Sequence, residues 1–121
     1  MLLDTCIIID YLRGKPNAVD FLESLNTVPA IASATVAELY SGVRGIKEQE
    51  LLRSLVEALD VYDLDISTAE KSGEIFQKYQ PSHGLDLIDA IIAATATINS
   101  LELATLNIKH FPMFPDLRRP Y

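Results

Sequence analysis

The stretch Leu87–Ile98 reads LIDAIIAATATI and is apolar or small on every face of a helix, apart from one charge at Asp89. A helix without a polar face is surrounded by protein, so this stretch predicts the centre of a layered fold. A carboxylate taken out of water is costly unless a partner or a cation compensates it. If Asp86 is the N-cap residue, Asp89 occupies the third helical position, where free N–H groups favour a carboxylate. Taken alone, Asp89 is best explained as a cap.

Outward from this helix, short apolar runs alternate with helical stretches, which indicates an α/β domain with parallel strands. The whole chain, residues 1–121, is predicted to be one domain, because its length leaves no room for two cores. We expect strands at residues 1–3, 28–32, 61–64 and 102–106, and a short edge strand at 116–119. We expect helices at residues 5–12, 16–25, 33 to about 42, 47–59, 67–80 and 87–99.

Two of these helices start at a recognisable capping pattern. Thr35 with Glu38, and Ser67 with Glu70, have the spacing of a capping box. Pro81 is expected to end the second helix, because proline cannot donate a backbone hydrogen bond and its ring clashes with the preceding turn.

Composition excludes several classes of protein. Hydrophobic residues make up 49% of the chain and charged residues 22%, with only five glycines and six prolines, so a disordered or low-complexity chain is excluded. The single cysteine, Cys6, excludes an internal disulfide and a zinc cluster and fits a reducing cytoplasm. Residues 90–98 form the longest apolar run, about half of what spans a bilayer, and the N-terminus lacks the pattern of a secretion signal. We therefore expect a soluble, cytoplasmic protein.

The net charge argues against a simple nucleic-acid-binding protein. The chain has 10 Lys and Arg against 17 Asp and Glu, a net charge of −7, which is the wrong sign for binding by counterion release alone. The objection weakens if carboxylates gather to hold divalent cations, because a bound cation reverses the local field that a phosphate meets. The position of the acids therefore decides the function class.

Two further acids could be either helix caps or ligands of a cation, as Asp89 could. Asp4 follows the first expected strand, and Glu38 lies in the helix after the second, and each has a cap explanation of its own. All three acids are expected where a strand gives way to a helix, and in parallel α/β folds those ends form the ligand crevice. Converging carboxylates repel one another unless a cation neutralises them. A hard ion such as Mg²⁺, which takes carboxylates, waters and phosphate oxygens, suits phosphodiester chemistry.

Four short motifs contain these acids or follow them in the chain. They are LLDT at 2–5 with IIID at 7–10, VAEL at 36–39 with Gly42, DAIIAATA at 89–96, and TLNIKHF at 105–111. Together they resemble the PIN-domain ribonucleases, and among these the VapC-type toxins of toxin–antitoxin modules, over essentially the whole chain. The resemblance implies a three-layer α/β/α sandwich with a central, mainly parallel sheet of four to five strands.

By this resemblance Asp4, Glu38 and Asp89 are metal-binding acids, and Asn107 occupies the family's fourth acidic position. Asparagine is a neutral oxygen ligand, so the site departs from a full acidic quartet and has one charge fewer for a second metal. Thr105 also matches the motif, and its hydroxyl would orient a metal-bound water. A plain threonine at a strand end is the alternative.

The activity implied by the resemblance is that of an endoribonuclease. Mg²⁺ or Mn²⁺ on Asp4 and Asp89, with Glu38 partly through water, would activate water for attack on an RNA phosphodiester, leaving a 5′-phosphate and a 3′-hydroxyl. The implied partners besides RNA are a cognate antitoxin and a second copy of the chain in a homodimer. The leucine-lined segment 36–59, which includes an amphipathic surface helix at 47–59, is the candidate surface for either protein.

Other polar side chains near these motifs have simpler explanations. Asp86 is expected to be an N-cap, and Asp10 to be structural or to support the site indirectly through another residue. His83 and His110 lack the partners of a zinc site and are expected to face solvent. Several basic residues could line an RNA groove or be solvated surface; these are Arg13, Lys15, Arg44, Lys47 and Lys109.

Two alternatives to the ribonuclease remain. LLDT begins like the nucleophile strand of a haloacid dehalogenase-type phosphatase, although that motif has a second aspartate where this chain has Cys6. The other alternative is a non-catalytic PIN-like protein that binds RNA or a partner without cleaving it. Asn107 is compatible with such a module. Asp4, Glu38 and Asp89 favour an enzyme, because a binding module has no need of buried acids.

Overall fold

A four-stranded parallel sheet forms the middle of the computed structural model, which describes all 121 residues. The strands lie in the order β3-β2-β1-β4, with Leu2 of β1 opposite Ala30 of β2 and Leu103 of β4. Their bounds are β1 Leu2–Leu3, β2 Ala30–Ala32, β3 Asp60–Tyr62 and β4 Leu103–Ala104. The edge strand predicted at 116–119 is wrong: this segment is irregular, and Pro115 and Pro120 on either side cannot donate to a sheet.

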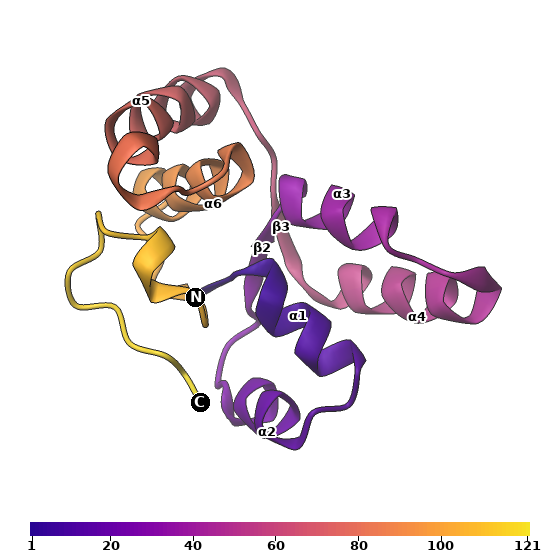
Figure 1. The fold of residues 1–121 in the computed structure, drawn as a ribbon. Helices are drawn as coiled ribbons and strands as arrows, with labels where there is room; N and C mark the ends of the chain where they lie inside the picture. The colour runs from indigo at the N-terminus through magenta and orange to yellow at the C-terminus, as the bar shows by residue number, and fades with distance from the viewer.

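Helices cover both faces of this sheet. In Figure 1, α5 and α6 pack together on one side, while α1, α2, α3 and α4 lie on the other. The helices are α1 Thr5–Leu12, α2 Pro16–Ser24, α3 Ser33–Ser41, α4 Gly45–Ala58, α5 Ile66–His83 and α6 Leu87–Ile98, followed by one 3₁₀ turn, η1, at Ile108–His110. All six predicted helices are present.

Strands β1, β2 and β4 are buried on both sides, as a three-layer sandwich requires, whereas the edge strand β3 is largely exposed. Successive side chains of a strand point to opposite faces of the sheet. Leu2 and Leu3 therefore belong to two different clusters of the core. The cluster on the α5 and α6 side contains Leu2, Ala30, Ala32 and Leu103, and the cluster on the α1, α3 and α4 side contains Leu3, Ile31 and Ala104. The predicted α/β/α layering is confirmed.

Helix α6 is as deeply placed as its sequence predicts. Seven of its twelve residues are buried, and the hydroxyls of Thr95 and Thr97 donate to the carbonyls of Ile91 and Ala93 one turn earlier. The first of these bonds satisfies the hydroxyl of buried Thr95, which would otherwise be costly in an apolar layer.

Both predicted capping boxes are wrong, for local reasons. Helix α3 begins directly after β2 with Ala32 at the N-cap position, so Thr35 lies inside the helix, where it cannot cap. Helix α5 is capped by Asp65, whose carboxylate accepts a hydrogen bond of 2.8 Å from the N–H of Thr68. An aspartate one position before the helix fills the role that the sequence pattern assigned to Ser67.

The predicted stop of α5 before Pro81 is also wrong. The helix includes Pro81 and ends at His83, with Gly84 in the left-handed conformation at φ 62°. A proline in the last turn forfeits only one hydrogen bond, and the N–H of Gly84 donates to Gln80 at 2.9 Å to close that turn.

The C-terminal residue returns to the first helix. The hydroxyl of Tyr121 donates to Asp10 Oδ2 at 2.8 Å, and Lys15 Nζ lies 3.0 Å from Oδ1 of the same carboxylate. Burial acts to raise the pKa of Asp10, but the bonds from Lys15 and Tyr121 hold it below its usual value. Of the two roles expected for Asp10, these contacts support the structural one.

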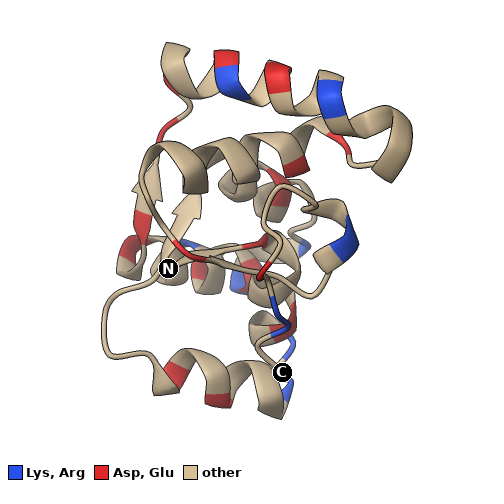
Figure 2. Cartoon of the chain, turned by 90° about the vertical axis from the view of Figure 1, so that its left-hand side faces the viewer, with Lys and Arg blue, Asp and Glu red and all other residues tan.

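Charged side chains are distributed unevenly over the surface. Figure 2 shows α5 carrying both signs in alternation, whereas α2 carries acidic residues only. No helix combines the length and the apolar character needed to cross a membrane.

Replacing Ile92 by alanine is expected to lower the free energy of unfolding by about 2–5 kcal/mol, because the side chain is 1% exposed in the layer between the sheet and α5. Urea denaturation followed by circular dichroism measures the change. Leu87→Ala on the same helix is the control: its side chain is 52% exposed, and we expect a change within about 0.5 kcal/mol. Equal losses for both variants would contradict the placement of α6.

Candidate metal-binding acidic site

Asp4 is the most deeply buried acid of the chain and lies at the carboxyl end of β1. Its Oδ1 accepts a hydrogen bond of 2.8 Å from the N–H of Thr5, and its Oδ2 accepts one of 2.6 Å from the hydroxyl of Thr105. Thr105 directly follows β4, which pairs with β1, so two neighbouring strand ends meet at this carboxylate. Asp4 also caps α1, and the cap and the site therefore use the same side chain.

Glu38 is joined to Asp4 through Thr5, a residue that sequence reasoning did not single out. The Thr5 hydroxyl donates to Glu38 Oε1 at 2.7 Å and lies 3.1 Å from the hydroxyl of Thr35. A hydroxyl has one proton, so Thr35 acts as the donor in its contact with Thr5. The two threonines therefore fix Glu38, the sixth residue of α3. The only sequence signal for Thr5 is its place directly after Asp4.

Asp89 lies at the start of α6, in a capping box with Asp86. Asp86 accepts from the N–H of Asp89 at 2.8 Å, and Asp89 Oδ2 accepts from the N–H of Asp86 at 3.2 Å. The cap prediction for both residues is confirmed. The expectation that Asp89 follows a strand is wrong, because α6 follows α5, and the hairpin of these helices brings the residue to the site.

Both histidines were predicted to face solvent. His83 is exposed, as predicted, but His110 is partly buried. His110 Nδ1 lies 3.3 Å from Asp89 Oδ2, and the side chain is one-third exposed. The two residues are far apart in sequence, so periodicity carried no signal for this contact.

The environment of Asp89 disfavours its charged form. Burial, followed by the charges of Asp86 and Asp4, raises its pKa to about 6, against the opposing effects of the Asp86 N–H and of His110. Because Asp4 contributes to this shift, the two carboxylates lie close enough to repel each other. A divalent cation between them would remove that repulsion.

The donor set fits a hard cation, although it is not a preformed three-carboxylate cage. No three His, Cys, Asp or Glu side chains form a group that could hold a metal ion, so the expected convergence of Asp4, Glu38 and Asp89 is not met. Mg²⁺ usually takes one or two carboxylates and keeps several waters, and the Asp4 and Asp89 pair matches that requirement. Glu38 is linked to Asp4 only through Thr5, whose hydroxyl donates to Glu38 and whose N–H donates to Asp4.

Thr105 lies buried beside Asp4, and Asn107 lies at the exposed edge of the site. The N–H of Asn107 donates to Thr105 Oγ1 at 3.0 Å, while the Asn107 side chain is exposed. The one proton of the Thr105 hydroxyl points at Asp4, so this threonine orients the carboxylate.

Cys6 is a second neighbour of Asp4 that sequence reasoning missed. Its Sγ lies 3.5 Å from Asp4 Oδ2 and 3.9 Å from Thr105 Oγ1. Burial and the Asp4 charge raise the pKa of the Cys6 thiol to about 11. The neutral thiol is therefore a weak donor to Asp4.

A cavity of about 510 Å³ opens beside Glu38, between α1, α3 and α4. Its charged lining consists of Glu38, Glu48, Arg13 and Arg44, so two of the five predicted basic residues lie here. Lys15 instead pairs with Asp10. The apolar lining consists of Ile9, Leu12, Leu39, Val43, Leu51 and Leu52.

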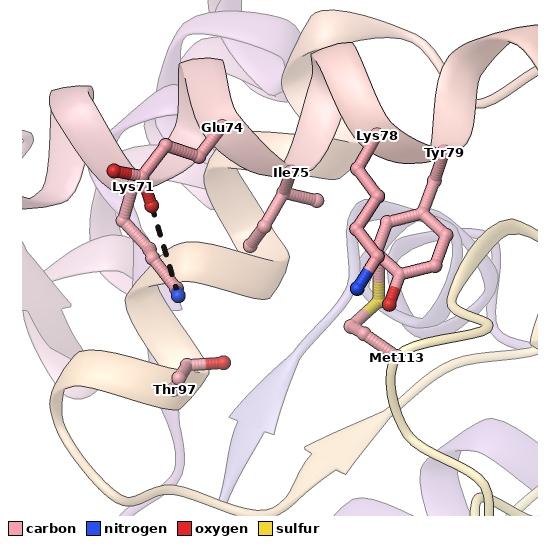
Figure 3. A pocket seen from close by; sticks show the side chains of 7 residues that line it. All are labelled: Lys71, Glu74, Ile75, Lys78, Tyr79, Thr97 and Met113. Carbon is pink, nitrogen blue, oxygen red and sulfur yellow. Dashed lines mark ion pairs between the residues drawn. The ribbon is translucent and has the colours of Figure 1, made fainter.

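A second cavity of about 380 Å³ contains none of the acids of the site. It lies along α5, between Lys71, Lys78 and Met113 (Figure 3), and Lys71 Nζ is 3.9 Å from Glu74 Oε2. Of the three predicted acids, Glu38 lines the first cavity, whereas Asp4 and Asp89 line neither cavity.

Comparison with known proteins gives one consistent result. The model of the PIN domain family matches residues 1–113. The chain is 38% identical to ribonuclease VapC19 of Mycobacterium tuberculosis, covering 99% of this chain and 98% of that protein. It is 37% identical to ribonuclease VapC10 of the same organism, covering 100% and 92%. A toxin–antitoxin complex from Klebsiella pneumoniae contains a chain of similar structure, with a TM-score of 0.85, 32% identity and coverage of 99% and 97%.

The raised pKa of Asp89 predicts that the metal-free protein loses stability with rising pH. The native carboxyl holds its proton up to about pH 6, whereas the unfolded one releases it near its usual value of 3.8. Between these pH values the native state binds more protons, so the free energy of unfolding falls as pH rises. Asp89→Asn removes this dependence, and its stability relative to wild type should increase from pH 4 to pH 7 by an amount on the order of 2 kcal/mol.

Thermal denaturation in EDTA across this pH range measures the effect. Asp20→Asn, an exposed acid on α2, is the control and should run parallel to wild type. A constant difference between Asp89→Asn and wild type from pH 4 to pH 7 would contradict the assignment.

Proposed function

The chain belongs to the PIN domain family, as a VapC-type endoribonuclease toxin of a toxin–antitoxin system, and we propose that Asp4 and Asp89 hold the Mg²⁺ or Mn²⁺ with which it hydrolyses RNA. The observation that carries the proposal is the position of these two carboxylates: Asp4 is buried at the carboxyl end of β1, and Asp89 lies near enough for the charge of Asp4 to add to the effect of burial in raising its pKa. Glu38 would reach the cation through water, since Thr5 separates it from Asp4: the Thr5 hydroxyl donates to Glu38, and the Thr5 N–H donates to Asp4.

When bound, such a cation supplies Lewis acidity at neutral pH, both for activating water and for offsetting the charge of the phosphate. The chain's own part is orientation. Thr5 and Thr105 fix both oxygens of Asp4, and the capping box fixes Asp89. Asn107 brings a neutral amide to the exposed rim, where an RNA strand would enter.

The basic side chains beside Glu38 support the choice of a polyanionic substrate. Arg13 and Arg44 line the cavity that contains Glu38, in a chain whose net charge is −7. Phosphates on either side of the cleaved bond would meet these guanidinium groups.

The partner proteins follow from the same cavity. Its apolar lining between α1, α3 and α4 supports the segment 36–59 as the place where an antitoxin binds. Complexes of this kind are known for similar chains, such as the toxin–antitoxin complex from Klebsiella pneumoniae. We also propose a homodimer, which sedimentation velocity tests, and a location in the cytoplasm, which agrees with a single free cysteine.

The two alternatives raised by the sequence are less well supported. A haloacid dehalogenase-type phosphatase would need a second acid at position 6, and the chain matches the PIN family over residues 1–113 instead. A non-catalytic module would not need to bury Asp4 beside Asp89.

RNA cleavage is expected to require both acids and a divalent cation. Asp4→Asn and Asp89→Asn should each lower the rate of cleavage by roughly 100-fold or more, because each removes a charge that would hold the cation. The assay incubates structured RNAs with antitoxin-free protein in Mg²⁺, Mn²⁺ or EDTA and identifies the 5′ ends of the products. We expect 5′-phosphates with wild type and no cleavage in EDTA.

Asp10→Asn is the matched control, since Asp10 is also a buried carboxylate on the first helix but pairs with Lys15 and Tyr121. Its cleavage rate per folded molecule should equal that of wild type, although its melting temperature should fall. Wild-type cleavage that persists in EDTA, or in both acid variants, would refute the metal-dependent mechanism.

A further inference from the structure

His110 is held rigidly beside the acidic site. It ends the turn η1, in which its N–H donates to Asn107 at 3.0 Å and the N–H of Phe111 donates to Ile108 at 3.0 Å. The side chain of Phe111 is fully buried in the core cluster under α5 and α6. The buried neighbour anchors the turn, so the place of the imidazole is set by packing.

The imidazole contacts one particular oxygen of Asp89. His110 Nδ1 lies 3.3 Å from Oδ2, the same oxygen that accepts the N–H of Asp86 at 3.2 Å. Oδ1 of Asp89 has no hydrogen-bond partner within the chain. Two contacts thus hold one oxygen of the carboxylate and leave the other free for a ligand.

The turn also links two parts of the site. Asn107 immediately precedes η1, and its N–H donates to Thr105, which donates to Asp4. Through His110 this segment touches Asp89, so one short stretch of chain contacts both acids that would share the cation.

We propose that His110 is a positioning residue, which holds the Asp89 carboxylate so that its free oxygen is presented to the divalent cation; this inference rests on the proposed function. Carboxylates that ligate metals are commonly fixed by outer partners, and loss of such a partner typically weakens metal binding by about 10- to 100-fold. His110 acts through Asp89 and needs no contact with RNA.

The test compares Mn²⁺ binding by calorimetry in wild type, His110→Phe and His110→Asn. Phenylalanine keeps a ring of similar size but lacks the nitrogen, whereas asparagine places an amide nitrogen near the position of Nδ1. We expect His110→Phe to raise the Kd for Mn²⁺ by roughly tenfold and His110→Asn to stay within about threefold of wild type. RNA cleavage by His110→Phe should approach the wild-type rate at saturating Mn²⁺.

His83→Phe is the matched control, because His83 is exposed at the end of α5 and its Nδ1 contacts only Ser82, at 2.7 Å. Its Kd should equal that of wild type. Melting temperatures in EDTA establish that each variant is folded, and if His110→Phe is not, His110→Leu replaces it with the same expected result.

Each remaining outcome has a definite meaning. An unchanged Kd in His110→Phe overturns the inference, as does an equal rise in His110→Phe and His110→Asn, since the shape of the ring and not its nitrogen would then matter. Wild type that binds no Mn²⁺ refutes the proposed function itself. If wild type binds Mn²⁺ and cleaves RNA, the proposed function stands, and the result with His110→Phe then tests the role of His110 alone.

Discussion

The buried carboxylate of Asp4 is the constraint on which the rest of the structure depends. Its two oxygens have left water and must be satisfied by donors from the chain. One donor is the first N–H of α1, and the other is the hydroxyl of Thr105, 101 residues away. The second bond exists only because β4 pairs with β1 in the sheet. The pairing of the first and the last strand of the chain is therefore needed before this one acid can be tolerated.

Placing Asp89 near the buried Asp4 lowers the stability of the metal-free protein. Asp89 is fixed by its capping box in a partly buried place that the charge of Asp4 also reaches, and burial together with the charges of Asp86 and Asp4 raises its pKa to about 6. A structure selected for stability alone would place an amide at one of these positions, because repulsion between buried charges has no structural benefit. A bound cation would offset the repulsion between the two carboxylates. Cation binding would therefore raise the free energy of unfolding of the native protein.

Much of the fold could be predicted because its signals are local. The uniformly apolar composition of α6, the cap that Asp4 forms at the start of α1 and the amphipathic periodicity of α4 are all visible along the chain. The errors arose where two residues competed for one role or where the partner was distant. Asp65 and Ser67 could both cap α5, and only the backbone at Asp65 decides it. Thr5 and His110 were missed because their partners lie 33 and 21 positions away, and no pattern along the chain reports such contacts.

The net charge of −7, which argued against a nucleic-acid substrate, takes a different meaning once the acids are placed. Asp4, Asp89 and Glu38 would repel a phosphate in the metal-free protein, while Arg13 and Arg44 in the neighbouring cavity would attract it. A cation on the acids reverses the first effect and leaves the second unchanged. Cation and RNA must then favour each other's binding by the same factor, because linkage between two ligands is reciprocal. In the proposed enzyme the acidic composition is thus a means of making RNA binding at the cleavage site conditional on the metal.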